Sequence, residues 1–190
     1  EAEIEMSALE RDPPRPVRRV VTGRGGNGLT AIASDAAVSP ILPPLPPGTA
    51  FFDLWGADTV PGLPNDGAKP DYRDWFPPDG GYRFGLITLP RDGTRQPPAD
   101  RAEALAETNA LLPGLMDVMD PQHPGWHATD TIDLIYVLRG GCVLKLDSGE
   151  TVPLEAGDTL IQNGARHAWG NPGQVDCALL VVSLGVKRKS

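Results

Sequence analysis

The sequence predicts an all-β fold in which short antiparallel strands close into a barrel or a sandwich. Short apolar runs alternate with turn residues throughout the second half of the chain, and the composition includes 22 Gly and 21 Pro among 190 residues. Regular spacing of strands and turns is typical of an antiparallel barrel or sandwich rather than a parallel sheet. A chain of this length holds one ordinary hydrophobic core, so a single domain is expected.

Several short segments have the apolar, β-branched and aromatic character of strands. They cover residues 17–22, 29–33, 49–55, 82–89, 132–138, 142–146, 151–154, 159–162, 167–169 and 175–184. The glycine-rich stretch 23–28 joins the first two, because glycine permits the positive φ that hairpin turns need. One amphipathic helix is predicted from Ala99 to Leu112, and we expect it to cover one end of the barrel.

The two ends of the chain differ from the rest. Residues 1–16 are charged and proline-rich, which predicts a disordered arm, and the first three residues look like an artificial extension. The single domain is therefore expected to span residues 17–190, with its barrel core at about 120–184. The basic residues 187–189 are predicted to be a solvated tail.

The overall charge limits the kinds of partner. A formal net charge of -8 argues against nucleic acid or an anionic membrane as the main partner, because both bind basic surfaces. No apolar run approaches the roughly 18 residues that a transmembrane helix needs, and the chain does not open on a secretion signal. We therefore expect a cytoplasmic protein.

Both cysteines fall in apolar strand segments. Cys142 and Cys177 form neither a C-x-x-C pair nor a dense framework, so we interpret them as buried thiols. A disulfide between them is the alternative. Neither has a basic neighbour in the sequence, and no Gly-x-Ser-x-Gly segment is present, so catalysis by a serine or cysteine nucleophile is not expected.

Two segments in the second half of the chain contain two of the three histidines. The first reads G-W-H-A-T-D-T-I-D-L-I-Y-V-L-R-G (residues 125–140), and the second reads G-D-T-L-I-Q-N-G-A-R-H-A-W-G-N (residues 157–171). Together they resemble the two motifs of the cupin superfamily. The resemblance implies a jelly-roll barrel of the double-stranded β-helix type, here with extra N-terminal strands and one short helix. Because cupins often dimerise through added strands, it also implies a homodimer.

The resemblance assigns roles to particular positions. His127 stands at the first histidine of the first motif, Thr129 replaces the second, and Asp133 stands where glutamate is usual. His167 and Asn171 complete the second motif, which is one residue shorter than usual before its histidine. Three ligand positions of the usual four are therefore kept.

His127, Asp133 and His167 are predicted to form one site and to be its catalytic groups. On one straight strand His127 and Asp133 would lie about 20 Å apart, so the chain must turn near residues 130–131 to bring them together. Two imidazoles and one carboxylate are typical ligands of open mononuclear sites, which implies a divalent metal such as Fe, Mn, Ni or Zn. The alternatives are a metal-free hydrogen-bonded cluster, with His167 as general acid or base, and a site that only binds.

Further side chains are predicted to bind the substrate: Arg83, Thr129, Thr131, Gln162 and Trp169. The two threonines share the strand parity of His127, and Trp169 shares that of His167, so each set points to one side of its strand. Trp169 is accordingly predicted to form a pocket wall.

The interpretations of Gln162 and Arg83 each retain an alternative, whereas Tyr136 is placed outside the barrel. Gln162 replaces a proline of the usual second motif, and its amide either orients a ligand or water or serves its own turn. Arg83 lies among apolar neighbours, where a structural ion pair is the alternative to a substrate carboxylate. Tyr136 has the parity opposite to Asp133, so we place it on the barrel exterior or at an interface.

Three functions are compatible with these residues. The first is a metal-dependent, non-oxidative lyase, isomerase, dehydratase or cyclase acting on a small organic acid, a carbonyl compound or an aromatic, polyketide-like substrate. The second is an Fe(II) dioxygenase with the same ligands, and the third is a ligand-binding barrel without turnover. The first is preferred because Thr129 interrupts the four-ligand set common among cupin oxygenases, although fold and reaction are separable.

Overall fold

The structure is a computed structural model that describes residues 14–189. The strands are β1 (Val17–Arg24), β2 (Thr30–Val38), β3 (Ala50–Ala57), β4 (Tyr82–Leu89), β5 (Thr131–Arg139), β6 (Gly141–Leu146), β7 (Thr151–Glu155), β8 (Thr159–Asn163), β9 (His167–Gly170) and β10 (Cys177–Gly185). An α-helix, α1 (Arg101–Leu111), and a short 3-10 helix, η1 (Met116–Val118), lie between β4 and β5. Of the arm predicted over residues 1–16, residues 1–13 lie outside the described part of the chain.

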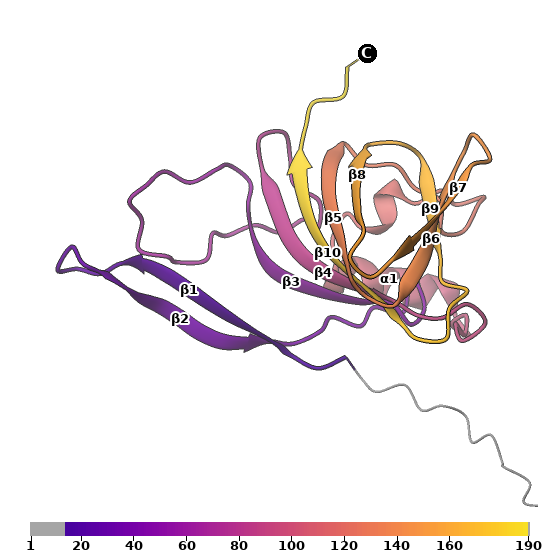
Figure 1. Ribbon diagram of the computed structural model, residues 1–190, viewed down its shortest axis with the longest axis horizontal. Helices are drawn as coiled ribbons and strands as arrows, with labels where there is room; N and C mark the ends of the chain where they lie inside the picture. Colours follow the sequence, from indigo (N-terminus) through magenta and orange to yellow (C-terminus); the bar gives the residue numbers. More distant parts are fainter. Residues whose placement is uncertain (1–13, 190) are drawn as a thin grey trace, which may run out of the picture.

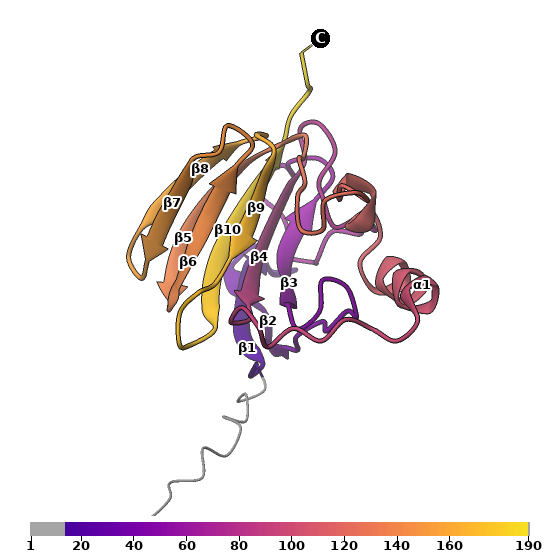
Figure 2. The same ribbon diagram turned by 90° about the vertical axis from the view of Figure 1, so that its right-hand side faces the viewer.

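Two antiparallel sheets pack face to face and make up the barrel (Figure 2). One has the strand order β3-β4-β10-β5-β8, and the other has the order β7-β6-β9. A separate hairpin of β1 and β2 projects beside them (Figure 1). The predicted all-β fold with added N-terminal strands and one short helix is confirmed.

The core between the sheets follows the two-residue alternation of the strands. On β5, Ile135 and Val137 point inward and are 6% and 1% exposed, whereas the intervening Tyr136 is 43% exposed, so Tyr136 lies on the exterior as predicted. Cys142 and Cys177 belong to the same core as free, buried thiols. The alternation therefore directs one face of β5 into the barrel interior and the other face outward.

The N-terminal hairpin is longer than its sequence predicted. β2 extends to Val38 because it pairs with β1 as far as Val17, and these two residues pack on the outer face of the five-stranded sheet. Ala36 and Ala37 carry no strand signal of their own, so only pairing across the hairpin reveals the extension. Gly28 takes the positive φ of 79° that the turn requires.

Helix α1 lies outside the barrel on the side of β3 (Figure 2), and the residues that follow it, Leu112 and Leu115, pack with Phe51 of β3. Asp100 caps its first turn by accepting hydrogen bonds from the N–H groups of Ala102 and Glu103. On the buried side, the hydroxyl of Thr108 accepts a hydrogen bond from the N–H of Leu45. Among the described residues, no helix combines the length and hydrophobicity that crossing a membrane requires.

Asn171 ties the turn before β10 to the end of β4. Its side-chain Nδ2 donates to the carbonyl oxygens of Leu89 (3.2 Å) and Val175 (3.0 Å), and its Oδ1 accepts from the N–H of Gly173 (3.0 Å). The residue is 0% exposed, so water does not replace these partners when the amide is removed. The motif asparagine therefore has a structural role.

Replacing Asn171 by alanine is expected to lower the free energy of unfolding by about 2–4 kcal/mol, because buried partners lose their hydrogen bonds. Urea denaturation of the purified variant measures this change. Asn163→Ala, at an exposed position on β8, is the matched control and is expected to change stability by less than about 0.5 kcal/mol. Equal unfolding midpoints for the two variants would contradict the assignment.

Candidate active site

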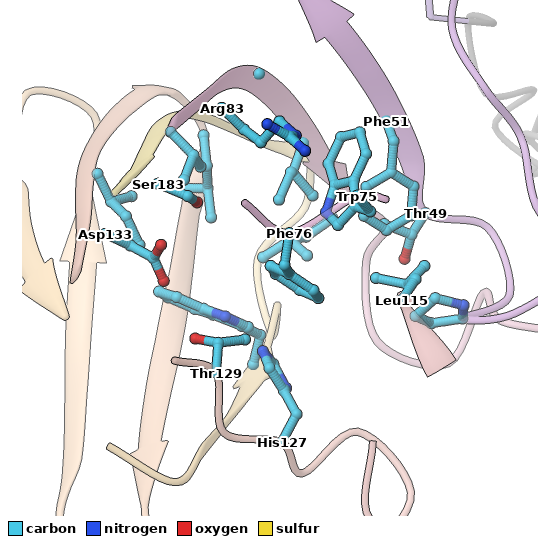
Figure 3. Close-up of a pocket in the computed structure, with 18 of the residues that line it drawn as sticks. Thr49, Phe51, Trp75, Phe76, Arg83, Leu115, His127, Thr129, Asp133 and Ser183 are labelled. Carbon is cyan, nitrogen blue, oxygen red and sulfur yellow. The ribbon is translucent and has the colours of Figure 1, made fainter. Parts of the chain in front are cut away.

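A cavity of about 130 Å³ lies between the two large sheets and reaches the edge of β3. One water molecule needs only about 10–15 Å³ of such space, so the cavity has room for a small molecule. Much of its wall is apolar and aromatic, with Phe51, Trp75, Phe76, Ile87, Leu115, Met119, Ile135, Trp169, Leu179 and Val181. Figure 3 shows Phe51, Trp75 and Leu115 on one side of the cavity and Asp133 with Ser183 on the other.

The two histidines of the sequence motifs meet at one wall of this cavity. His127 and His167 exchange two backbone hydrogen bonds of 2.9 Å, and their ring centroids lie 4.2 Å apart. His167 is 3% exposed and stands at the start of β9. The structure thus brings together two imidazoles that are far apart in the sequence.

A backbone carbonyl two residues earlier orients each imidazole ring. Nδ1 of His127 lies 3.2 Å from the carbonyl oxygen of Gly125, and Nδ1 of His167 lies 2.8 Å from that of Ala165. Because a carbonyl oxygen only accepts hydrogen bonds, Nδ1 of each ring is the protonated nitrogen. In the neutral ring, Nε2 keeps a lone pair that can accept a proton.

The surroundings favour the neutral form of both rings. Burial, followed by the proximity of His167, lowers the pKa of His127 to about 4. Burial also lowers the pKa of His167, against the opposing influence of a carbonyl hydrogen bond and of Asp133. Both imidazoles are therefore proton acceptors at neutral pH.

Asp133 faces the cavity from the opposite sheet. It lies on β5 in the five-stranded sheet, whereas His127 bridges β9 in the three-stranded sheet. The chain bends at Asp130, directly before β5 begins, so the turn expected near residues 130–131 is present. The two histidines and the carboxylate consequently line the same cavity, and Figure 3 shows His127 and Asp133 among its lining residues.

Two buried polar atoms next to each other on β5 and β8 have no hydrogen-bond partner among the described residues. They are Oδ1 of Asp133, which is 8% exposed, and Nε2 of Gln162, which is 4% exposed. The two residues stand opposite each other in the register of β5 and β8. Since buried polar groups are normally paired, the free acceptor of Asp133, which lines the cavity, favours a ligand with a polar atom at this position.

Burial also changes the protonation of Asp133. It raises the pKa of the carboxyl group, although Ser183, Thr131 and the charge of His167 act in the opposite direction. A protonated carboxyl group can donate a hydrogen bond, which a carboxylate cannot. The raised pKa therefore makes the hydrogen-bond-donating form of Asp133 more accessible than it is in an exposed aspartate.

The three predicted ligands have the donor types of a divalent metal site. Imidazoles held through Nδ1–H by backbone carbonyls are common around metals, so the donor types are suitable. Within residues 14–189, however, no three His, Cys, Asp or Glu side chains are grouped so that they could hold an ion. The divalent metal at His127, Asp133 and His167 therefore stays a prediction.

The other predicted binding residues have different surroundings. Thr129 lines the cavity, and its hydroxyl lies 2.7 Å from that of Thr131, so these two buried groups satisfy each other. Trp169 lines the cavity and meets the ring of His167 edge to face, with centroids 5.7 Å apart. Gln162 is buried behind Asp133 and is not among the residues that line the cavity.

Arg83 reaches the cavity wall, but protein groups already use its guanidinium. Nη2 donates to Asp58 at 2.6 Å and to the carbonyl oxygen of Asp74 at 3.0 Å, and Nη1 donates to its neighbour Tyr82. The guanidinium also lies over the ring of Tyr72. The structural ion pair offered as the alternative is what the structure shows, because the buried charge is fully compensated within the protein.

Two arginines near the site were not identified from the sequence. Arg95, in the loop after β4, lines the cavity. Arg188 is exposed, in agreement with the predicted solvated tail, and it also donates to the carbonyl oxygen of Thr129 at 2.9 Å and to Asp130. Neither lies on a strand, so no periodic pattern indicates where its side chain points.

Comparisons with known proteins agree with the site's position in the chain. The family model described as "Cupin domain" matches residues 115–183, the region that supplies both histidines and Asp133. This region of the chain is therefore a cupin domain, as its two motifs predicted.

Parts of the chain are also similar in sequence to proteins of fungal biosynthesis clusters. The chain is 36% identical over 70 residues to Oryzines biosynthesis cluster protein J of Aspergillus oryzae, covering 34% of this chain and 39% of that protein. It is 40% identical over 95 residues to Phomopsin biosynthesis cluster protein C' of Diaporthe leptostromiformis, covering 46% and 50%. The chain thus spans half or less of the length of these relatives.

Two solved structures are similar over most of the chain at low sequence identity. The cupin domain of Schizosaccharomyces pombe Cnp3 has a TM-score of 0.44 and 11% identity, covering 90% of this chain and 88% of that chain. The polyketide cyclase RemF from Streptomyces resistomycificus has a TM-score of 0.42 and 20% identity, covering 77% and 72%.

Proposed function

We propose that this protein is an enzyme that moves protons on a small, largely apolar carbonyl compound, in a non-oxidative isomerase, lyase, dehydratase or cyclase reaction. The observation that carries the proposal is the pair of imidazoles at one wall of the cavity, each with Nδ1–H held by a carbonyl and Nε2 left as an acceptor. A positioned base of this kind typically contributes about 10²–10⁴-fold to a rate.

Asp133 has the complementary role. When Nε2 of His127 or His167 removes a proton from the carbon beside a carbonyl, the electron pair of the broken C–H bond moves toward the carbonyl oxygen. In its protonated form, which burial favours, the carboxyl group of Asp133 donates a hydrogen bond to that oxygen and stabilises the enolate. The imidazolium then returns the proton to another carbon or to a leaving group, so no electrons leave the substrate.

The aromatic walls select the apolar body of the substrate. Trp75, Phe76 and Trp169 offer flat faces, and the cavity lies within a mostly apolar lining that strengthens electrostatic interactions. Two relatives are named after the biosynthesis clusters of oryzines and phomopsins, which supports a role in small-molecule metabolism. A metal-dependent form of the same reaction and an Fe(II) dioxygenase remain the competing hypotheses from the sequence.

Proton exchange with solvent tests the proposal without knowledge of the natural substrate. The protein is incubated in D₂O with a panel of cyclic and aryl ketones, under argon and with a chelator, and deuterium at the α-carbon is followed by NMR. Exchange under both conditions supports the proposal. Exchange that requires added metal, with metal content lost in His127→Ala by elemental analysis, would support the metal-dependent form instead. Turnover that consumes oxygen would support the dioxygenase.

We also propose that the chain forms a homodimer through the outer face of the five-stranded sheet. This face exposes Leu134, Tyr136, Leu138, Ile161 and Leu184 on β5, β8 and β10, each between 38% and 54% exposed. Leu134 and Ile161 are cross-strand neighbours, so the exposed apolar side chains are contiguous. Contiguous apolar patches are uncommon on monomers and mark interaction sites.

Ile161→Glu is expected to convert the dimer to a monomer, because it places a charge within the proposed interface. Size-exclusion chromatography with light scattering over a range of concentrations measures the molar mass. Val152→Glu changes an equally apolar exposed position on the three-stranded sheet and is expected to leave the mass unchanged. A monomeric wild-type protein would contradict the proposal.

A further inference from the structure

Arg95 lines the cavity and keeps a hydrogen-bond donor that no described protein group accepts. Its Nε is buried and has no hydrogen-bond partner among the described residues. Its closest acidic neighbour is Asp92, with Oδ1 3.9 Å from Nη2, and Asp92 is itself half exposed. Arg83, the other arginine of the lining, is fully engaged by Asp58 and by carbonyl oxygens, so the two arginines differ sharply.

The loop that carries Arg95 is held at the end of the barrel opposite to Asp133. The loop follows Leu89, which pairs with Cys177 at the start of β10, whereas Asp133 pairs with Ser183 near the other end of β10. At about 3.3 Å per residue, these two positions on β10 are about 20 Å apart. A backbone hydrogen bond of 2.7 Å from Asp92 to Asn171 holds the loop there.

Polar groups therefore reach the cavity from two directions. The imidazole pair and Asp133, which act on a carbonyl group in the proposed function, belong to the lining. Arg95, carried by the loop at the opposite end of β10, adds a guanidinium with an unpaired Nε–H to the same lining, which also includes aromatic side chains. Nε–H and an Nη2–H point from the same edge of a guanidinium, and this edge binds a carboxylate with two parallel hydrogen bonds.

We infer that Arg95 binds an anionic group of the substrate, so that the substrate is an apolar, ring-containing carboxylic acid with a second carbonyl or hydroxyl group at its far end. This inference rests on the proposed function for the orientation of the substrate, and on Arg95 alone for its charge. A carboxylate fits better than a phosphate, because one guanidinium edge matches two oxygens and the rest of the lining near it is apolar.

Calorimetric titration with 2-naphthoate and with 2-naphthamide tests the inference on the whole chain, since the two probes differ in charge and hardly in shape. The wild-type protein is expected to bind the carboxylate about tenfold or more tightly than the amide, the usual gain from a charge-assisted hydrogen bond. Arg95→Gln is expected to remove this preference, and Arg95→Lys is expected to keep part of it. Arg101→Gln, at an exposed position at the start of α1, is the matched control and is expected to keep all of it.

The outcomes separate this inference from the proposed function. Equal affinity for both probes in the wild-type protein, or a carboxylate preference that survives in Arg95→Gln, would overturn the inference. A thermal melt of each variant shows that the fold is intact. A carboxylate preference without any proton exchange would support the anion site and count against the proposed function, whereas exchange without a preference would do the reverse.

Discussion

His167→Ala is expected to lower the rate of α-proton exchange by about 10²–10⁴-fold, the usual loss when a positioned general base is removed. A carbonyl oxygen and the neighbouring His127 hold the ring of His167 in place. A water molecule in the space left by the ring would not be a positioned base of comparable strength. Initial rates measured by NMR give the ratio of the variant to the wild-type protein. The affinity for a substrate analogue is expected to change much less, which separates loss of a base from loss of the cavity.

The third histidine provides the matched control for this prediction. His123 is exposed and pairs with Asp120 outside the cavity, so His123→Ala is expected to exchange protons at the wild-type rate within about twofold. The pH dependence is a second readout. Because burial lowers the pKa of His167, exchange is expected to continue below the usual imidazole value of 6.5 and to fall only at a more acidic pH. A fall centred on pH 6.5 would show that an exposed imidazole is the base.

Asp133→Asn is expected to have opposite effects on activity and stability. Proton exchange falls by about 10²-fold or more, because the enolate loses its acidic hydrogen-bond donor. The free energy of unfolding at pH 7 rises by roughly 0.5–2 kcal/mol, the usual gain when a destabilising functional group is replaced. Urea denaturation and the exchange assay, run on the same preparation, measure both effects.

The sign of the stability effect follows from the direction of the pKa shift. In the unfolded chain Asp133 loses its proton near the usual value of 3.8, whereas burial raises the pKa in the folded protein. Between these two pKa values the folded state binds more protons, so the free energy of unfolding falls as the pH rises through this window. The stability advantage of Asp133→Asn should therefore be absent below pH 3.8 and grow above it. An advantage that does not depend on pH would contradict this account.

The two motifs and the strand parity of the sequence predicted much of the candidate site. The distance argument required a turn between His127 and Asp133, and the structure places the bend at Asp130 and the two side chains on different sheets. Parity also separated the exterior Tyr136 from the inward-facing residues of β5. Such arguments succeed because alternation along a strand depends only on local geometry.

The same reasoning could not decide how charged side chains are paired. Arg83 and Arg95 are both arginines close to apolar segments, yet one is fully engaged and the other is not. Arg188 is exposed, as predicted, but the sequence did not indicate that it also binds the loop that carries Thr129. In each case the partner is far away in the sequence, and long side chains reach it from positions that have no periodic pattern.

By itself, the sequence determined the all-β barrel, the places of its strands within a few residues, and the two segments that contribute the histidines. Only the tertiary structure decided that the two imidazole rings lie beside each other, that Oδ1 of Asp133 and Nε2 of Gln162 lack a hydrogen-bond partner among the described residues, and that Arg95 lines the cavity with an unpaired Nε. The physical reason is that strand patterns follow from neighbours in the chain, whereas burial and hydrogen-bond pairing depend on groups that meet only when the two sheets close.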